Sequence, residues 1–396
     1  MTTVIREIQS ELDTLRTRGT YKEMLTVDGP MGPMVRLADG REVVNLCSNN
    51  YLGLADHPEV VAGAKDALVR HGFGTASVRF ICGTMALHEQ LETALAEFCG
   101  QEKATTFVSC WNANEALVAT LLREGDAVIS DELNHASIID GCRLCGKGVR
   151  RLVYRHGDMD DLDAKLTDAA DAGRKLVITD GVFSMEGDLA DLPAIVDRAR
   201  SHKALVAVDD SHAHGVLGRR GRGTPEHFGV KVDIVTGTLG KALGGAAGGF
   251  IASWTPIIEL MTQRARPQLF SNSLPPAVTG GALAAITLLN REPHRVGHLQ
   301  ENVGYLRKGL KRLGYEVIES PTAILPILIG DTARAIHLAR ALLEQGVLVV
   351  GFGYPVVPEG KARLRIQVCA THTRNHLDKA LAAFEGLRKQ TPALQC

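Results

Sequence analysis

The sequence predicts an α/β protein with a large domain built on a mainly parallel, seven-stranded sheet and a smaller C-terminal α/β domain. The chain has 396 residues, of which 45% are hydrophobic, so it can bury a large core in two or three domains. Short apolar runs alternate with helical patterns from about residue 104 to 252, which is typical of parallel sheets covered by helices on both faces. After about residue 290 this alternation gives way to a shorter mixture of helices and strands.

We expect three parts in the chain: an N-terminal segment over residues 1–50, a large domain over 51–290 and a small domain over 291–396. The first part combines an amphipathic helix near its start with a hairpin turned by Asp39-Gly40. No internal repeat, low-complexity tract or flexible linker interrupts the sequence. The parts are therefore expected to follow one another without long connections.

Seven apolar runs are the expected strands of the large sheet. They cover residues 104–109, 127–130, 152–154, 175–179, 204–208, 232–236 and 249–252. Polar clusters follow five of these runs, at residues 109–112, 131–135, 180–184, 209–212 and 238–241. Because ligands bind at the carboxyl ends of the strands in such sheets, these clusters predict one shared ligand site.

The small domain is expected to begin with a long helix over about residues 298–313. Its predicted strands cover residues 315–318, 324–328, 347–350 and 363–368, and its later helices cover 332–345 and 375–389.

Charge and composition exclude several classes of function. With 44 basic and 45 acidic residues, the chain gives no reason to expect nucleic acid or an anionic membrane as a partner. No apolar run approaches the roughly 20 residues of a membrane span. The N-terminus carries acids and no signal-peptide pattern, so we expect a cytoplasmic protein.

The eight cysteines are expected to be reduced, because most lie in apolar segments. Cys142 and Cys145 form a C-x-x-C pair, but no second pair stands at the spacing of a zinc site. We interpret this pair as structural and expect no metal site.

The glycine-rich stretch Thr236–Gly245 contains a single lysine, Lys241. It can be a solvated lysine on a glycine turn. A Walker A loop is excluded, because Ala242 stands where Ser or Thr must hold magnesium and Val235 stands where the first Gly should be. The stretch can also present a lysine that forms a Schiff base with pyridoxal 5'-phosphate (PLP), a role for which burial and nearby cations suit an amine. The stretch alone leaves the first and third interpretations open.

Other polar clusters supply the groups that PLP chemistry needs. An acid must face the ring nitrogen, because a protonated pyridine withdraws electrons from a substrate carbanion. Asp209 follows the run 204–208 and is the first candidate, whereas Asp210 can instead cap the next turn. His135 and His212 are candidates for the ring face and the phenolic oxygen.

Two further segments can bind anions. Residues 109–112 open a helix whose N-terminus can hold a phosphate. Arg365 lies on an apolar strand, where a guanidinium is costly unless it pairs with an anion. That anion can be a substrate carboxylate or the partner in an internal salt bridge.

On these residues the chain resembles the α-oxoamine synthases, a group of fold-type I PLP-dependent transferases, over nearly its whole length. The motifs are Asn49-Asn-Tyr-Leu-Gly53, Asn134-His-Ala-Ser137, Asp180-Gly-Val-Phe-Ser-Met185, Asp209-Asp-Ser-His212, Gly237-Thr-Leu-Gly-Lys241 and Ser273-Leu-Pro-Pro276. Within the group the chain is most similar to the glycine C-acetyltransferases (2-amino-3-ketobutyrate CoA ligases). That branch is indicated by Ala76–Thr84, Ser130–Gly141, Arg266–Ser273 and Tyr354–Pro358.

The resemblance implies roles for the cofactor site. Lys241 would bind PLP covalently and move the substrate proton, while Asp209 pairs with the ring nitrogen and His135 stacks on the ring. The remaining cofactor-binding residues would be His212 and Ser184 near the phenolic oxygen, Cys110, Trp111 and Thr238 in the same subunit, and Ser271 and Asn272 reaching the phosphate from the partner subunit.

For the substrate, the resemblance implies that Asn49, His135 and Arg365 orient it in a homodimer with shared active sites. The implied reaction is the condensation of glycine with acetyl-CoA to 2-amino-3-oxobutanoate and CoA. The alternative is another amino acid or a longer acyl-CoA, as in 8-amino-7-oxononanoate synthase.

Three residues depart from the pattern of this branch. Trp111 replaces a smaller aromatic ring, and His214 is an added histidine. Gly353 stands where a bulkier aromatic residue is expected. If Gly353 lines the acyl pocket, longer acyl groups become acceptable.

Overall fold

The computed structural model of the chain describes residues 2–354 and 356–390. Their contacts form two units. The small unit comprises Met1–Ser48, Met185–Gly187 and Glu301–Cys396, and the large unit comprises Asn49–Ser184 and Asp188–Gln300. The N-terminal residues thus belong with the C-terminal part of the chain.

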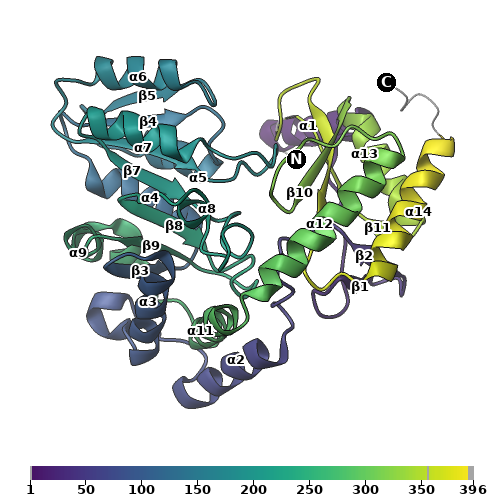
Figure 1. The fold of residues 1–396 in the computed structure, drawn as a ribbon, viewed down its shortest axis with the longest axis horizontal. Coiled ribbons are helices and arrows are strands. Elements are labelled where there is room, and N and C mark those ends of the chain that lie inside the picture. The colour runs from purple at the N-terminus through teal and green to yellow at the C-terminus, as the bar shows by residue number, and fades with distance from the viewer. Residues whose placement is uncertain (1, 355, 391–396) are drawn as a thin grey trace. The chain divides into compact units, whose positions relative to one another are not determined.

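The large unit is organised around one seven-stranded sheet, in the order β3-β9-β8-β7-β6-β4-β5 (Figure 1). Its strands are β3 (Lys103–Phe107), β4 (Ala127–Asp131), β5 (Arg150–Tyr154), β6 (Lys175–Asp180), β7 (Leu205–Asp209), β8 (Ile234–Thr238) and β9 (Gly249–Ser253). Neighbours from β8 to β5 pair in parallel, and only β9 is antiparallel to both of its neighbours. The predicted mainly parallel sheet is confirmed.

Helices cover both faces of this sheet. The helices of the large unit are α2 (Pro58–His71), α3 (Ala86–Cys99), α4 (Cys110–Leu121), α5 (Ala136–Arg143), α6 (Met159–Asp168), α7 (Leu192–Ser201), α8 (Thr224–Phe228), α9 (Thr255–Arg264), α10 (Arg266–Phe270) and α11 (Pro276–Arg291), with a π-helix at Arg79–Gly83. Because side chains alternate along a strand, Ala207 faces the core shared with α4 and α9, while Val206 and Val208 face the core shared with α6 and α7.

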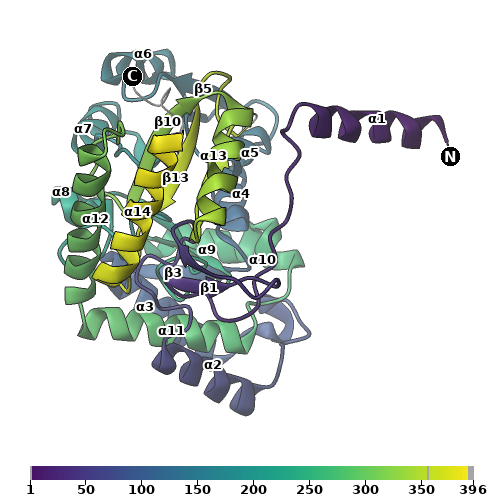
Figure 2. The ribbon, with the colours of Figure 1, turned by 90° about the vertical axis from the view of Figure 1, so that its right-hand side faces the viewer.

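The small unit contains two three-stranded sheets. One has the order β1-β2-β11 and the other β10-β13-β12. The strands are β1 (Met34–Arg36), β2 (Glu42–Asn45), β10 (Ile324–Gly330), β11 (Val347–Leu348), β12 (Val350–Phe352) and β13 (Ala362–Gln367). The helices are α1 (Thr3–Thr17), α12 (His294–Arg312), which begins in the large unit, α13 (Thr332–Glu344) and α14 (Arg374–Gln390). Helix α13 packs on the second sheet and on α14 (Figure 2).

Two strand predictions for this unit were wrong. Residues 315–318 form no strand, and Val317 makes only an isolated bridge with Ile327. Here the Tyr315 hydroxyl donates to Phe384 O at 2.8 Å and its ring packs edge-on against Phe384, so side-chain packing holds the segment. The predicted strand over 347–350 is divided between β11 and β12, which pair in different sheets. No helix within residues 2–354 and 356–390 is long and apolar enough to cross a membrane.

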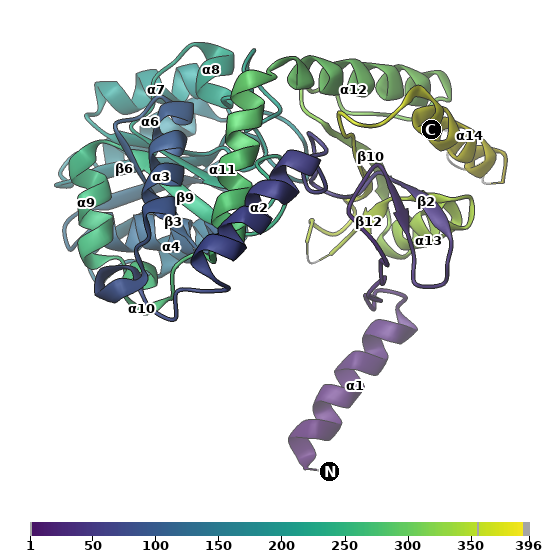
Figure 3. The same ribbon diagram turned by 90° about the horizontal axis from the view of Figure 1, so that it is seen from below.

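Helices α2 and α11 lie side by side in the large unit, where glycines let their backbones approach (Figure 3). A Cβ added at Gly280 would lie 2.5 Å from Ala67 Cβ and 2.6 Å from Gly63 O. Both distances are shorter than van der Waals contact. The close approach of α2 and α11 therefore requires glycine at position 280.

We predict that Gly280→Ala destabilises the protein. Overpacking costs about 1–3 kcal/mol, and the better helix propensity of alanine returns about 1 kcal/mol. Gly297→Ala is the matched control, because Gly297 is also helical and has no atom within 4 Å of its added Cβ. Thermal unfolding should show a lower Tm for Gly280→Ala and an equal or higher Tm for Gly297→Ala. Equal shifts in both variants would contradict the close-packing account.

Candidate cofactor site

The carboxyl ends of β4, β6 and β7 bring three of the predicted polar clusters together in the large unit. Asp180 and Asp209 pair in register across β6 and β7. The His135 backbone N–H donates to Asp180 Oδ2 at 2.7 Å. Asn134, which follows β4, binds the end of β6. Its Nδ2 donates to Ile178 O at 2.9 Å and its Oδ1 accepts from Asp180 N at 2.7 Å. These hydrogen bonds fix where His135 begins helix α5.

Asp209 is a buried carboxylate that stays ionised. Asn114 Nδ2 donates to Asp209 Oδ2 at 2.6 Å, and Ser211 N donates to Asp209 Oδ1 at 2.8 Å. Burial alone would raise the pKa of Asp209, but the hydrogen bonds from Ser211 and Asn114 and the charge of Lys241 hold that pKa below its ordinary value. The site therefore offers a negative charge that can stabilise a protonated nitrogen.

Lys241 follows β8 in a glycine-rich bend. Burial is the largest influence on the pKa values of Asp180, Asp209 and His135, and the charge of Lys241 acts on all three. Thr238 supports the bend, because its hydroxyl donates to Gly248 O at 3.2 Å and accepts from Gly240 N at 3.1 Å. The amine thus belongs to the same electrostatic cluster as Asp209.

His135 and Trp111 form an aromatic pair in this cluster. Their ring centres lie 5.9 Å apart in an edge-to-face arrangement at 80°. His135 Nδ1 accepts from Ser137 N at 3.2 Å, so a neutral ring carries its proton on Nε2. Burial lowers the pKa of His135 despite the opposing charge of Asp209, which favours the neutral form at pH 7.

His212 and Asn49 meet through Tyr51. The Tyr51 hydroxyl and His212 Nδ1 share a hydrogen bond of 2.7 Å, and both side chains are buried. The same hydroxyl lies 3.4 Å from Asn49 Oδ1. Tyr51 therefore sets the orientation of the His212 ring.

The N-terminus of α4 reaches the same cluster. Ser109 caps the helix by accepting from Asn112 N at 3.1 Å, and the Cys110 thiol lies 3.6 Å from Asp209 Oδ2. A Cβ added at Gly249 would lie 2.2 Å from Cys110 N, so only glycine lets β9 begin against this helix turn. The N-terminus of a helix is a binding site for phosphate.

Four other predicted residues lie apart from these contacts. Ser184 is half-buried in a turn after β6. Ser271 and Asn272 follow α10, where Asn272 is exposed and forms an isolated bridge with Val78. Arg365 lies on β13 in the small unit. The structure thus brings together the predicted residues at 110, 111, 135, 209 and 241, and it links 49 to 212 through Tyr51, while Thr238 supports the bend that carries Lys241.

Three residues that hold this cluster were not predicted: Asn114, Ser211 and Tyr51. Asn114 is a fully buried amide within the apolar part of α4, and an amide among apolar helix residues is the signal that could have found it. Tyr51 and Ser211 stand inside recognised motifs. The contacts they make join different elements, so spacing along the chain does not show them.

Gly353 packs closely against Thr332. A Cβ added at Gly353 would lie 2.2 Å from Thr332 Cγ2. Its neighbours Phe352 and Tyr354 line an apolar cavity of about 540 Å³ in the small unit, whereas Gly353 does not. The small size of Gly353 is explained by its contact with Thr332 and gives no support for longer acyl groups.

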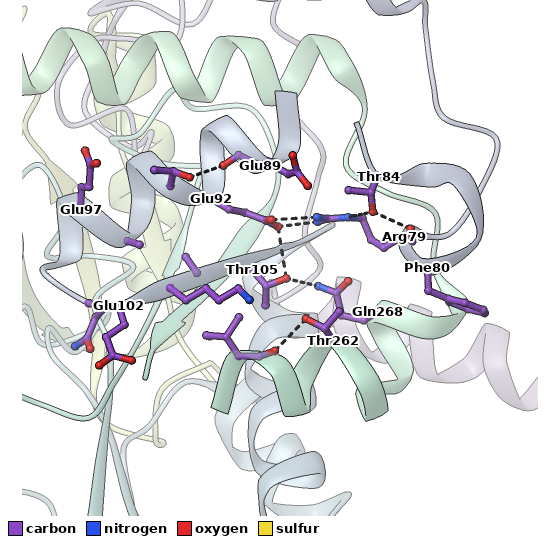
Figure 4. A pocket seen from close by; sticks show the side chains of 16 residues that line it. Arg79, Phe80, Thr84, Glu89, Glu92, Glu97, Glu102, Thr105, Thr262 and Gln268 are labelled. Carbon is purple, nitrogen blue, oxygen red and sulfur yellow. Dashed lines mark hydrogen bonds and ion pairs between the residues drawn. The ribbon is translucent and has the colours of Figure 1, made fainter. Parts of the chain in front are cut away.

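A separate cavity of about 490 Å³ in the large unit contains Arg79 of the predicted branch motif and none of the predicted site residues (Figure 4). Arg79 binds both carboxylate oxygens of Glu92, at 2.7 and 3.0 Å, and Glu92 also accepts from Thr106 N at 2.8 Å. Arg79 therefore anchors the π-helix to α3 and β3.

The residues of the Lys241 cluster fit PLP by their chemistry. The ionised Asp209 suits a protonated ring nitrogen, Lys241 supplies an amine, and the first turn of α4 offers N–H groups to a phosphate. The close approach that Gly249 permits leaves this turn beside the strand ends. No group of described residues could hold a metal ion.

Comparisons with known proteins identify the family. The model of the class I and II aminotransferases matches residues 41–384. The 2-amino-3-ketobutyrate coenzyme A ligase of Escherichia coli (strain K12) is 45% identical over 389 residues, with 97% of each chain covered. The 8-amino-7-oxononanoate synthase of Thermoanaerobacter pseudethanolicus is 45% identical over 386 residues, again with 97% of each chain covered.

Solved structures agree with this result. Serine palmitoyltransferase from Sphingomonas wittichii superposes with a TM-score of 0.92 and 34% identity, covering 99% of this chain and 98% of the other. These matches confirm the predicted fold and PLP as the cofactor. The chain belongs to the class I and II aminotransferase family and, within it, to the PLP-dependent α-oxoamine synthases.

Proposed function

We propose that this α-oxoamine synthase condenses glycine with acetyl-CoA to give 2-amino-3-oxobutanoate and CoA. The observation that carries the chemistry is the buried, ionised Asp209 in one electrostatic cluster with Lys241. The choice of glycine and acetyl-CoA is supported by the branch motifs, including Tyr354–Pro358, and by the likeness to 2-amino-3-ketobutyrate coenzyme A ligase. The equal likeness to 8-amino-7-oxononanoate synthase keeps a longer acyl-CoA as the alternative.

When bound, PLP supplies a ring that accepts the electron pair released at the α-carbon of the amino acid. Asp209 keeps the proton on the ring nitrogen, because its carboxylate is ionised. Lys241 would hold the cofactor covalently until the amine of the amino acid takes its place, and the freed Lys241 amine would then accept the α-proton. The α-carbon can now bond to the thioester carbonyl, as the carbon–sulfur bond breaks and CoA leaves.

The residues around Lys241 and Asp209 are proposed to bind the cofactor and to orient the substrate. His135, which pairs with Trp111, would lie on the ring face, and Cys110 on α4 and Thr238 on β8 would help to hold the cofactor. His212, held by Tyr51, acts near the phenolic oxygen. We propose that Ser184 also lies near the phenolic oxygen of the cofactor, and that Asn49 and Arg365 orient the substrate.

We further propose a homodimer with shared active sites. Ser271 and Asn272 would reach the phosphate bound by the partner subunit. The exposure of Asn272 supports this arrangement, because an exposed amide is accessible to a partner subunit.

The substrate assignment predicts a ranking of activities. Release of CoA should be measured for acyl-CoAs from acetyl to palmitoyl with glycine, alanine and serine. The highest kcat/KM is expected for acetyl-CoA with glycine, because the branch motifs favour this pair. A preference for alanine or serine with a long acyl-CoA would contradict the proposed reaction and leave the family membership unchanged.

The cofactor assignment predicts where PLP is attached. Borohydride reduction of the purified yellow protein should fix the cofactor on the peptide that contains Lys241, because an amine in this cluster is the proposed covalent partner. Mass spectrometry identifies the labelled peptide, and Lys241→Ala serves as the control that should retain no label. Label on any other lysine would overturn the role of Lys241.

A further inference from the structure

Two connections at the carboxyl ends of β4 and β6 are joined where His135 precedes α5. One runs from β4 to α5 over residues 132–135, and the other leaves β6 at Gly181. The His135 backbone N–H donates to Asp180 Oδ2 at 2.7 Å, so the end of β6 holds the end of the first connection. The same two connections are also linked by His156.

His156 follows β5 and lies between two carboxylates of the large unit. Its Nδ1 is 3.1 Å from Asp131 Oδ1 and 3.2 Å from Asp131 Oδ2, and its Nε2 is 2.9 Å from Asp188 Oδ2. Asp131 ends β4, and Asp188 belongs to the connection that leaves β6. Because an ionised carboxylate can only accept, a ring with a carboxylate at each nitrogen donates from both. This geometry is that of an imidazolium.

The contacts of His156 favour its protonated form at neutral pH. Its hydrogen bonds to Asp131 and Asp188 raise the pKa of His156 to about 10, although burial opposes the rise. The His156 side chain is 21% exposed and that of Asp131 only 3%, so water screens this ion pair only in part. The bridge is therefore charged on both sides across the physiological range.

Two further charged residues flank the bridge. Glu132 Oε1 accepts from His156 N at 2.9 Å, and Arg155 pairs with Asp158 and Asp161 at 2.7 and 3.6 Å. None of these interactions involves the imidazole ring. A substitution that removes the ring therefore leaves them in place.

Each carboxylate that His156 binds belongs to one of the two connections or to its start. Asp131 Oδ1 also accepts from Leu133 N at 2.8 Å, within the connection that carries His135. In the other connection, Phe183 N donates to Asp188 O at 3.1 Å, and the Phe183 ring lies 4.4 Å from the His156 ring in an edge-to-face arrangement. The two connections are thus joined once at His135 and once through His156.

We propose that His156 is a positioning residue that joins these two connections and thereby holds His135 in the Lys241 cluster. The inference rests on the proposed function in one respect, namely that the His135 ring contacts the cofactor. Without the imidazolium, Asp131 and Asp188 lose the cation between them, and His135 is held to the end of β6 by its backbone bond to Asp180 and by Asn134 alone.

The first test concerns the imidazolium. Because folding raises the pKa of His156 from 6.5, its contribution to stability is complete below this pH and is lost as the pH rises toward about 10. His156→Gln should therefore lower the Tm of the PLP-loaded protein by about 3 °C or more at about pH 6. The difference from the wild type should shrink toward about pH 10. A Tm difference that does not depend on pH would overturn the imidazolium bridge.

The second test concerns the position of His135. PLP is titrated into the cofactor-free protein well below its Tm, and binding is followed by the absorbance of the cofactor. His156→Gln should raise the Kd for PLP about tenfold, as expected when one binding contact is displaced. An unchanged Kd would leave His156 a stabilising residue only and would overturn the proposal.

His202→Gln is the matched control for this measurement. His202 Nε2 lies 3.0 Å from Asp163 Oδ1, and its side chain is 23% exposed, compared with 21% for His156. The substitution removes a similar histidine–carboxylate pair that joins α7 to α6 and not the two connections. It should leave the Kd for PLP unchanged, and a loss equal to that of His156→Gln would contradict a specific role for His156.

A double variant separates this inference from the proposed function. His135→Asn keeps a side chain that can cap α5 but removes the ring, and it should weaken PLP binding by itself. If His156 acts through His135, His156→Gln should cause no further loss in the His135→Asn protein. Fully additive losses would overturn the inference and leave the proposed function standing. Unchanged PLP binding in His135→Asn would refute the proposed contact between His135 and the cofactor, and the role given to His156 would fall with it.

Discussion

The hydrogen bond from Asn114 to Asp209 is the interaction on which the cofactor site depends. Burial opposes ionisation of a carboxylate, because the charged form loses its hydration. The hydrogen bonds from Ser211, the 2.6 Å bond from Asn114 and the charge of Lys241 reverse that effect and lower the pKa of Asp209. Helix α4, the end of β7 and the bend after β8 must therefore keep their places for the charge to persist. The seven-stranded sheet provides this, since α4, β7 and β8 all contribute residues to one core and the bend follows β8 directly.

The pKa of Asp210 is shifted in the opposite direction to that of Asp209, because the two neighbouring carboxyl groups have different contacts. Burial raises the pKa of Asp210 to about 7, although hydrogen bonds from Thr224 oppose the rise. Asp210 Oδ1 accepts from the Thr224 hydroxyl at 2.6 Å and Oδ2 from Thr224 N at 2.8 Å. Both carboxylate oxygens of Asp210 therefore accept hydrogen bonds from the first residue of α8. Asp209 is left as the acid that faces the cluster of Lys241 and His135.

The difference between Asp209 and Asp210 also shows which features of this protein the sequence alone could predict. Apolar runs such as 175–179 fall on strands because a buried strand must be apolar throughout, and the polar clusters at their ends followed from the parallel order. The sequence made Asp209 the first candidate and Asp210 the alternative, but the contacts that distinguish them depend on Asn114 and Thr224, which come from other elements. Residues 315–318 have the composition of a strand, yet packing against Phe384 replaces pairing there.

Protonation of the cofactor's ring nitrogen tests this account most directly. The enzyme can be loaded with PLP that carries ¹⁵N in the ring, and the nitrogen chemical shift measured from about pH 6 to about pH 9, well above the ordinary pKa of an aspartate. The account predicts a protonated nitrogen throughout this range in the wild type and in Asp210→Asn, and an unprotonated nitrogen in Asp209→Asn. An unprotonated nitrogen in the wild type at neutral pH, or a protonated one in Asp209→Asn, would contradict it.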